Sequence, residues 1–184
     1  MKKIVLLLSI LFATLGCKAQ IIPVEQYITY SGEILDGAYV KDVNGLLNDY
    51  VGTWVTTQNG DRYEFQIVKV IKSFLNTTWD MLYMRYKIVN ISTGKVIADT
   101  TDKTDDSHLV VKGSYLAASG SYVFDYMGLN NECGQNGQVF MGILNTNRSQ
   151  AKLFLSVTGS VYPSCTSVVA TQVLPTEMIT LTKQ

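Results

Sequence analysis

Short stretches in which apolar and polar residues alternate, divided by turn residues, recur through most of this chain. In the stretch from 62 to 70, Tyr63, Phe65 and Ile67 fall on one side, and the residues between them are polar. An alternation with a period of two predicts a half-buried strand, because successive strand side chains point to opposite faces. Asn59-Gly60, just before this stretch, is a strong signal for a two-residue hairpin turn.

The number and spacing of these stretches predict the fold class. We expect strands over 51–57, 62–70, 81–89, 95–98, 109–116, 122–127, 138–144, 152–157, 167–173 and 178–183. Consecutive strands joined by turns favour an all-β antiparallel up-and-down meander of about 8 to 10 strands, closed into a barrel or, alternatively, folded as a β-sandwich. Residues 50–184 would form this single domain, after an irregular lead-in over 20–49 that contains one short helical turn.

Residues 1–19 have the organisation of a secretory signal: two lysines, an apolar run, and a short segment of small or polar residues. At about 12 residues, the apolar run is too short to span a bilayer. Gly16-Cys17 is similar to the lipobox of bacterial lipoproteins, in which the cysteine is acylated. Alternatively, Cys17 and Ala19 mark an ordinary cleavage site. We therefore expect an exported protein, either an outer-membrane lipoprotein that faces the periplasm or, if cleaved after Ala19, a secreted or periplasmic protein.

Two cysteines, Cys133 and Cys165, remain once Cys17 is acylated or removed. Both lie among turn residues, where loops could approach each other across one end of a fold. Because an exported protein enters an oxidising compartment, we expect a disulfide between Cys133 and Cys165. A metal site is disfavoured here, since no further cysteine or histidine lies at ligand spacing.

The residue types exclude several classes of function. Basic and acidic residues number 15 each, so the chain lacks the basic surface of a nucleic-acid-binding protein. The one histidine, His108, follows an acidic stretch at 99–107 that lacks the EF-hand pattern, and no nucleophile paired with a base can be recognised. We expect no catalytic set, no metal site, no cofactor and no nucleic-acid partner, and contact with a membrane only through a lipid on Cys17.

The segment Leu46-Leu47-Asn48-Asp49-Tyr50-Val51-Gly52-Thr53-Trp54 resembles the opening of a calycin barrel, as in lipocalins, with a short helical turn before Gly-x-Trp on the first strand. In such barrels the tryptophan closes one end and packs near a basic residue of the last strand. The resemblance implies structural roles for Gly52 and Trp54, with Lys183 as the cation over the ring, worth about 0.5 to 2 kcal/mol. The leader ending in Cys-Lys-Ala-Gln, followed by a Gly-Thr-Trp domain, is similar to small uncharacterised exported proteins and lipoproteins of the Bacteroidota.

Two functions fit these observations. The first is a noncatalytic binding module of the cell envelope that holds a small apolar or amphipathic ligand in a cavity. The candidate cavity residues are Tyr63, Phe65, Ile67, Leu82 and Tyr86. The alternative is an envelope interaction protein with a filled core that binds a protein or a glycan through loops such as 130–137. Tyr83 shares its strand face with Arg85 and Lys87, so we expect it to be an outward, exposed aromatic.

Overall fold

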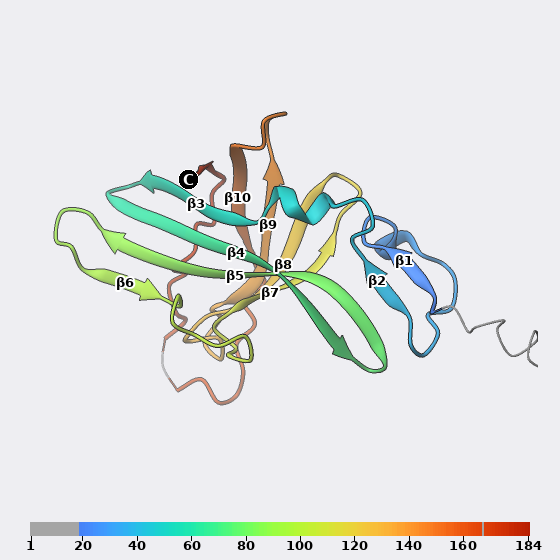
Figure 1. Cartoon of the computed structure of the whole chain (residues 1–184). Coiled ribbons are helices and arrows are strands. Elements are labelled where there is room, and N and C mark those ends of the chain that lie inside the picture. Colours follow the sequence, from blue (N-terminus) through green and yellow to red (C-terminus); the bar gives the residue numbers. More distant parts are fainter. Residues whose placement is uncertain (1–18, 167) are drawn as a thin grey trace, which may run out of the picture.

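The main body of the protein is a closed β-barrel (Figure 1), seen in a computed structural model that describes residues 19–166 and 168–184. Eight strands of these described residues form the barrel: β3 (Gly52–Gln58), β4 (Asp61–Phe74), β5 (Thr77–Asn90), β7 (Val111–Leu116), β8 (Ser121–Met127), β9 (Asn136–Ile143), β10 (Gln150–Val157) and β11 (Ile179–Lys183). Each is antiparallel to its neighbours, and the sheet closes where β11 pairs with β3 and β7 pairs with β5. The expected all-β up-and-down barrel is thus confirmed, and the sandwich alternative is wrong.

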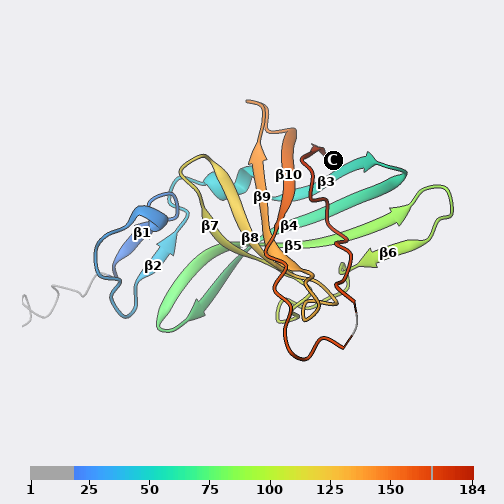
Figure 2. The same cartoon turned by 180° about the vertical axis from the view of Figure 1, so that it is seen from behind.

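The segment before the barrel is more regular than its sequence predicts. β1 (Ile21–Pro23) pairs in parallel with β2 (Tyr39–Lys41), and β2 pairs in parallel with the start of β5, so the sheet continues beyond the barrel (Figures 1 and 2). On the other side, β6 (Val96–Asp99) pairs with β5 as a short flap. The helical elements are the 3-10 turns η1 (Tyr27–Thr29) and η2 (Leu46–Asp49), and η2 forms at the predicted helical turn. Among the described residues, no helix has the length and apolar character needed to cross a membrane.

Two tight turns mark the ends of the long strand β4. Asn59 and Gly60 both have positive φ, 54° and 83°, as the predicted two-residue hairpin requires. At the other end Leu75 and Asn76 also have positive φ, 48° and 61°, and strands β4 and β5 stay paired up to this turn. The sequence predicts strands over 62–70 and 81–89, but residues 71–74 and 77–80 also belong to β4 and β5, so the predicted break between the strands is shorter than expected.

Apolar side chains from the inward faces of the strands fill the barrel. The largest fully buried ones include Trp54, Phe65, Phe124 and Tyr126. Phe124 meets Tyr122 edge to face, with ring centroids 4.8 Å apart. Such aromatic contacts add to the free energy gained by burial alone. Hollows of about 230 to 510 Å³ lie at one end of the barrel and on its outer surface.

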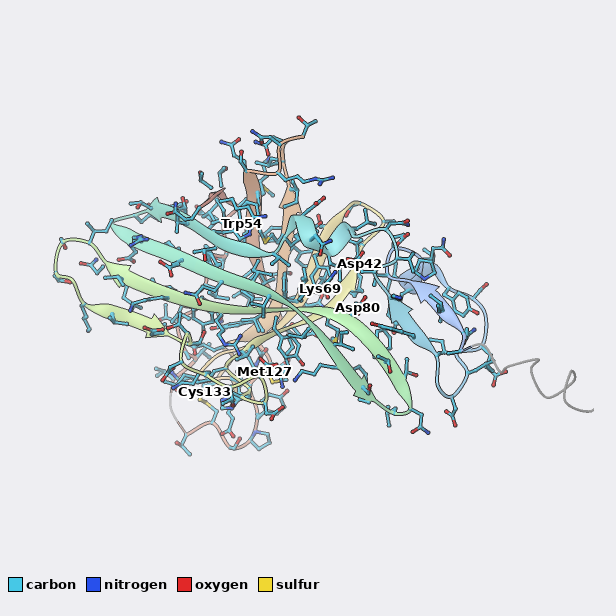
Figure 3. All side chains as sticks on the ribbon, in the orientation of Figure 1. Asp42, Trp54, Lys69, Asp80, Met127 and Cys133 are labelled. Carbon is cyan, nitrogen blue, oxygen red and sulfur yellow. A yellow bond between two sulfur atoms is a disulfide. The ribbon has the colours of Figure 1, made fainter. Side chains whose placement is uncertain are left out.

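A buried polar cluster joins the N-terminal segment to the barrel (Figure 3). The carboxylate of Asp80 on β5 accepts hydrogen bonds from the Tyr39 hydroxyl at 2.6 Å and from the Asp42 backbone N–H at 2.9 Å. The Asp42 carboxylate accepts one from the Leu47 N–H at 3.2 Å and pairs with Lys69, also at 3.2 Å. Desolvation by burial and then the contact with Asp80 raise the pKa of Tyr39 to about 12. These bonds hold β2 and η2 against β4 and β5.

Candidate functional site

Four of the five residues that the sequence suggests for a ligand cavity are buried in the barrel core. Phe65 and Leu82 are 0% exposed, Ile67 is 1% exposed and Tyr86 is 2% exposed, and all four belong to one apolar cluster. Tyr63 is half-buried at the edge of this cluster and stacks on Phe65, with ring centroids 6.4 Å apart. Side chains therefore occupy the interior at these positions.

One end of the barrel is closed by the residues that the calycin resemblance implies. Trp54 is 0% exposed, and its indole N–H donates to the Tyr50 carbonyl at 2.7 Å. Lys183 Nζ lies 5.2 Å from the centroid of the Trp54 ring and donates to the Asp49 carbonyl at 3.1 Å. Gly52 has φ of +133°, and a Cβ there would lie 2.9 Å from Lys183 Cε. A glycine is favoured at position 52 because L side chains rarely adopt this φ, and a Cβ would also displace the end of the Lys183 side chain.

The opposite end, which we call the mouth, is partly covered by residues 171–177 between β10 and β11. Leu174 inserts into the core at 2% exposure, and the Leu155 N–H donates to the Pro175 carbonyl at 2.7 Å. The described residues from 168 to 173 form no strand, so the strand expected over 167–173 is wrong, and Ser167 lies outside the described residues.

A cleft of about 470 Å³ opens at the mouth, between residues 171–177 and the β3–β4 hairpin. The hairpin contributes Gln58, Asn59 and Tyr63 to its lining. Among the five candidate cavity residues, Tyr63 is the one that lines this cleft. The volume lies within the range of about 300 to 1,000 Å³ that is typical of small-molecule sites.

Two polar side chains, Gln172 and Tyr63, line the cleft. Gln172 donates through Nε2 to the Gly134 carbonyl at 2.7 Å, but its Oε1 is buried without a hydrogen-bond donor among the described residues. Desolvation by burial and, to a smaller extent, the charge of Asp61 raise the pKa of Tyr63, so its hydroxyl stays protonated at neutral pH. The cleft thus combines an aromatic ring and a hydroxyl with Gln172, whose unpaired amide oxygen is itself buried.

A second hollow, of about 240 Å³, lies on the other side of the mouth and also involves Val173. Tyr86, Thr100 and Leu129 contribute to its walls. The Thr100 hydroxyl is already bonded, because it accepts from the Tyr86 N–H at 2.9 Å and donates to the Tyr86 carbonyl at 3.3 Å. The Thr100 hydroxyl is therefore less available to a ligand than the hydroxyl of Tyr63 in the cleft.

The expected disulfide between Cys133 and Cys165 is present, with the two Cα atoms 5.1 Å apart, and Figure 3 shows Cys133 in the loops at the mouth. It ties the loop after β8 to the segment after β10. Gln135 adds a second tie, because its Nε2 donates to the Thr171 carbonyl at 2.6 Å. The outer side of this loop bounds a hollow of about 510 Å³ with His108 on its rim.

Asp99 and Asp105 of the 99–107 stretch are paired with bases of the neighbouring strands, whereas Asp102 pairs with Lys103 in its own loop. Asp105 contacts Arg85 at 2.8 Å and Lys72 at 3.0 Å, and Asp99 contacts Lys87 at 3.1 Å. Hydrogen bonds from Arg85 and then Lys72 hold the pKa of Asp105 below its ordinary value. Within the part of the chain that the structure describes, no group of three or more His, Cys, Asp or Glu residues could hold a metal ion.

Tyr83 lies on the outer face of β5, as expected, but it is covered. It is 6% exposed and packs in a small apolar cluster with Met81 and Val110. Lys72 Nζ lies 5.5 Å from its ring centroid. The expectation that Tyr83 is an exposed aromatic is therefore wrong, because the segment before β7 folds over it.

The fold and the Gly52, Trp54 and Lys183 contacts define a small closed β-barrel protein of calycin-like architecture. The chain belongs to a family of unknown function, DUF6705, whose model it matches over residues 1–184. No curated protein matches the chain. No solved structure matches it either.

Proposed function

We propose that this protein is an exported, noncatalytic binding module of the cell envelope, anchored by a lipid on Cys17, and that it holds a small amphipathic ligand in the cleft at the mouth of its barrel. One observation carries this proposal. The interior positions are occupied by side chains, whereas a cleft of about 470 Å³ lies beside Tyr63. The ligand is therefore assigned to the mouth and not to the interior.

The chemistry of the cleft supports an amphipathic ligand. The ring of Tyr63 provides an apolar face, and its position is fixed by stacking on Phe65. The Oε1 of Gln172 has no donor among the described residues, and a ligand hydroxyl or amine would supply one once the Gln172 side chain turns this buried oxygen toward the cleft. A ligand with one apolar and one hydrogen-bonding part satisfies both.

Export is supported by the signal-like residues 1–19 and by the disulfide between Cys133 and Cys165. Disulfides persist in oxidising compartments and are rare in the cytosol. Cys17 is the third cysteine and is left over for acylation.

Native mass spectrometry tests the proposal on protein purified from the membrane fraction of its own cells. We expect a dissociable small molecule on the acylated wild-type chain, its loss in Tyr63→Ala, and its retention in the control Tyr162→Ala, since Tyr162 is 52% exposed and does not line the cleft. A chain without a bound molecule, or a Tyr63→Ala chain that keeps it, would contradict ligand binding at the mouth. An unacylated N-terminus would contradict the lipid anchor.

The filled interior also favours a second candidate, an envelope protein that binds a protein or a glycan through the loop at 130–137. This loop is held by the disulfide of Cys133 and by the bond from Gln135 to Thr171, so it presents a fixed surface. Crosslinking in the native host should then capture a partner through residue 130 or 131. Absence of any crosslinked product would count against this candidate.

A further inference from the structure

The turn between β4 and β5 carries an exposed apolar tip. Leu75 is 91% exposed, and on the strand that leads to it Ile71 is 65% and Phe74 48% exposed. Leu75 also has φ of +48°, a backbone region that branched, bulky residues rarely adopt. An apolar side chain held in water on a strained turn contributes little to folding, so Leu75 points to a contact outside the barrel. Phe74 stacks on Trp79, with ring centroids 5.5 Å apart, and leaves about half of its surface exposed beside Leu75.

Two further exposed apolar residues come from the N-terminal segment beside this turn. Ile21 is 54% and Leu35 53% exposed. The Gly37 N–H donates to the Asn76 carbonyl at 2.7 Å, which joins the loop after Leu35 to the turn. We call the five residues Ile21, Leu35, Ile71, Phe74 and Leu75 the tip surface; it surrounds the end of the β4–β5 hairpin, because Ile71 and Phe74 project from opposite faces of β4.

The chain enters the fold at this same surface. The side chain of Gln20 accepts from the Leu35 N–H at 2.9 Å, and its carbonyl accepts from the Tyr39 N–H at 2.7 Å. Figures 1 and 2 both show the start of the described chain at the end of the molecule that carries the β4–β5 turn. Cys17 is two residues before Ala19, so a lipid attached to it would begin within about 7 Å of Ala19.

We propose that the tip surface rests in the interfacial region of the bilayer that holds the acyl chains of Cys17. The inference relies on the lipid anchor proposed above. Its five residues are apolar, and the exposed Asp36 beside Leu35 would lie in the hydrated headgroup layer. Residue 75 protrudes on a turn, a shape that suits a bilayer surface, whereas a stable protein interface would need a broad area. The anchor and the tip surface would thus fix the barrel at two points.

This contact also sets the orientation of the mouth. Tyr63 and Leu75 lie near opposite ends of the hairpin strand β4, which runs from Asp61 to Phe74. Twelve residues of strand separate them by roughly 40 Å. With the tip surface on the membrane, the cleft beside Tyr63 faces away from it and is open to molecules in solution.

A fluorescent label tests the contact in the full chain, produced in cells that acylate lipoproteins and reconstituted into phosphatidylcholine and phosphatidylethanolamine vesicles. Leu75→Cys supplies one free thiol for a polarity-sensitive dye, since Cys133 and Cys165 are bonded and Cys17 would be acylated. Leu129→Cys is the matched control, because Leu129 is 75% exposed but lies at the mouth. We expect the dye at residue 75, and not at residue 129, to shift to shorter wavelength and to be quenched by nitroxide-labelled lipid chains.

Each outcome decides the inference. If the acylated chain floats with the vesicles but the dye at residue 75 is not quenched, the bilayer contact is overturned. The proposal of a lipid anchor on Cys17 would still stand. If the dye shifts to shorter wavelength without lipid quenching and native mass spectrometry shows a dimer, the tip surface contacts a second copy of the chain. That result would also overturn the bilayer contact. If the chain is not acylated and does not float, the anchor proposal fails and the inference fails with it.

Discussion

Replacing Phe65 by alanine tests whether the barrel interior is filled. Phe65 is 0% exposed, stacks on Tyr63, and lies between Trp54 on β3 and Tyr86 on β5 in the strand register. Removal of a fully buried phenylalanine from a packed core costs about 3 to 5 kcal/mol, because burial is lost and a cavity remains. We expect Phe65→Ala to lower the free energy of unfolding by this amount.

Equilibrium urea unfolding, followed by circular dichroism with the disulfide intact, measures this loss. The melting temperature should fall by about 2 to 4 °C for each kcal/mol in a domain of this size. Ile71→Ala on the same strand is the control, since Ile71 is 65% exposed and its loss should change the free energy by less than about 0.5 kcal/mol. A Phe65→Ala variant that loses less than about 1 kcal/mol would refute the reasoning, because phenylalanine lining an open cavity has few contacts to lose.

Three further predictions follow from contacts elsewhere in the barrel. Lys183→Met should cost about 1 to 2 kcal/mol in urea unfolding, because it removes the cation over Trp54 and the hydrogen bond to the Asp49 carbonyl. Lys183→Arg keeps a cation there and should cost less; equal losses would argue against a stabilising cation at this position. Reducing the bond between Cys133 and Cys165, 32 residues apart in sequence, should lower the free energy of unfolding by about 4 kcal/mol, and an unchanged urea midpoint would contradict this. The folded-state pKa of Asp105 lies below its ordinary value, so its contribution to stability is present above pH 4 or so and is lost as pH falls through the folded pKa. Asp105→Asn should therefore flatten the acid limb of a stability–pH profile, and an unaltered limb would show that the pairs of Asp105 do not stabilise the fold.

The parts of the fold that could be predicted from sequence are those governed by local pattern. The alternation of apolar and polar residues predicts most of the barrel strands. Asn59-Gly60 predicts the turn between β3 and β4, because both residues readily adopt positive φ. Leu75-Asn76 forms the same kind of turn without a glycine, so local chemistry gives little sign of it. The short strands β1 and β2 are held by long-range bonds to Asp80, which no local pattern records.

The candidate site was predictable only in part. Tyr63 could be identified because it alternates with Phe65 and Ile67. Its position at the mouth could not, because it depends on which end of β4 lies beside residues 171–177. Gln172 was missed, since its segment has the β-favouring composition of a strand and contains no proline or glycine that would argue against that interpretation. Tyr83 is buried by contact with Val110, which is distant in the sequence, so the pattern of its own strand could not predict this burial.

The central claim is that side chains fill the barrel and that the ligand site lies at the mouth. Xenon occupies dry apolar cavities, so crystals of the wild-type protein and of Phe65→Ala under xenon pressure test the claim directly. We predict no xenon among Phe65, Ile67, Leu82 and Tyr86 in the wild type, and xenon at the position of the missing ring in Phe65→Ala. Xenon bound inside the wild-type barrel would contradict the claim and return the ligand site to the interior.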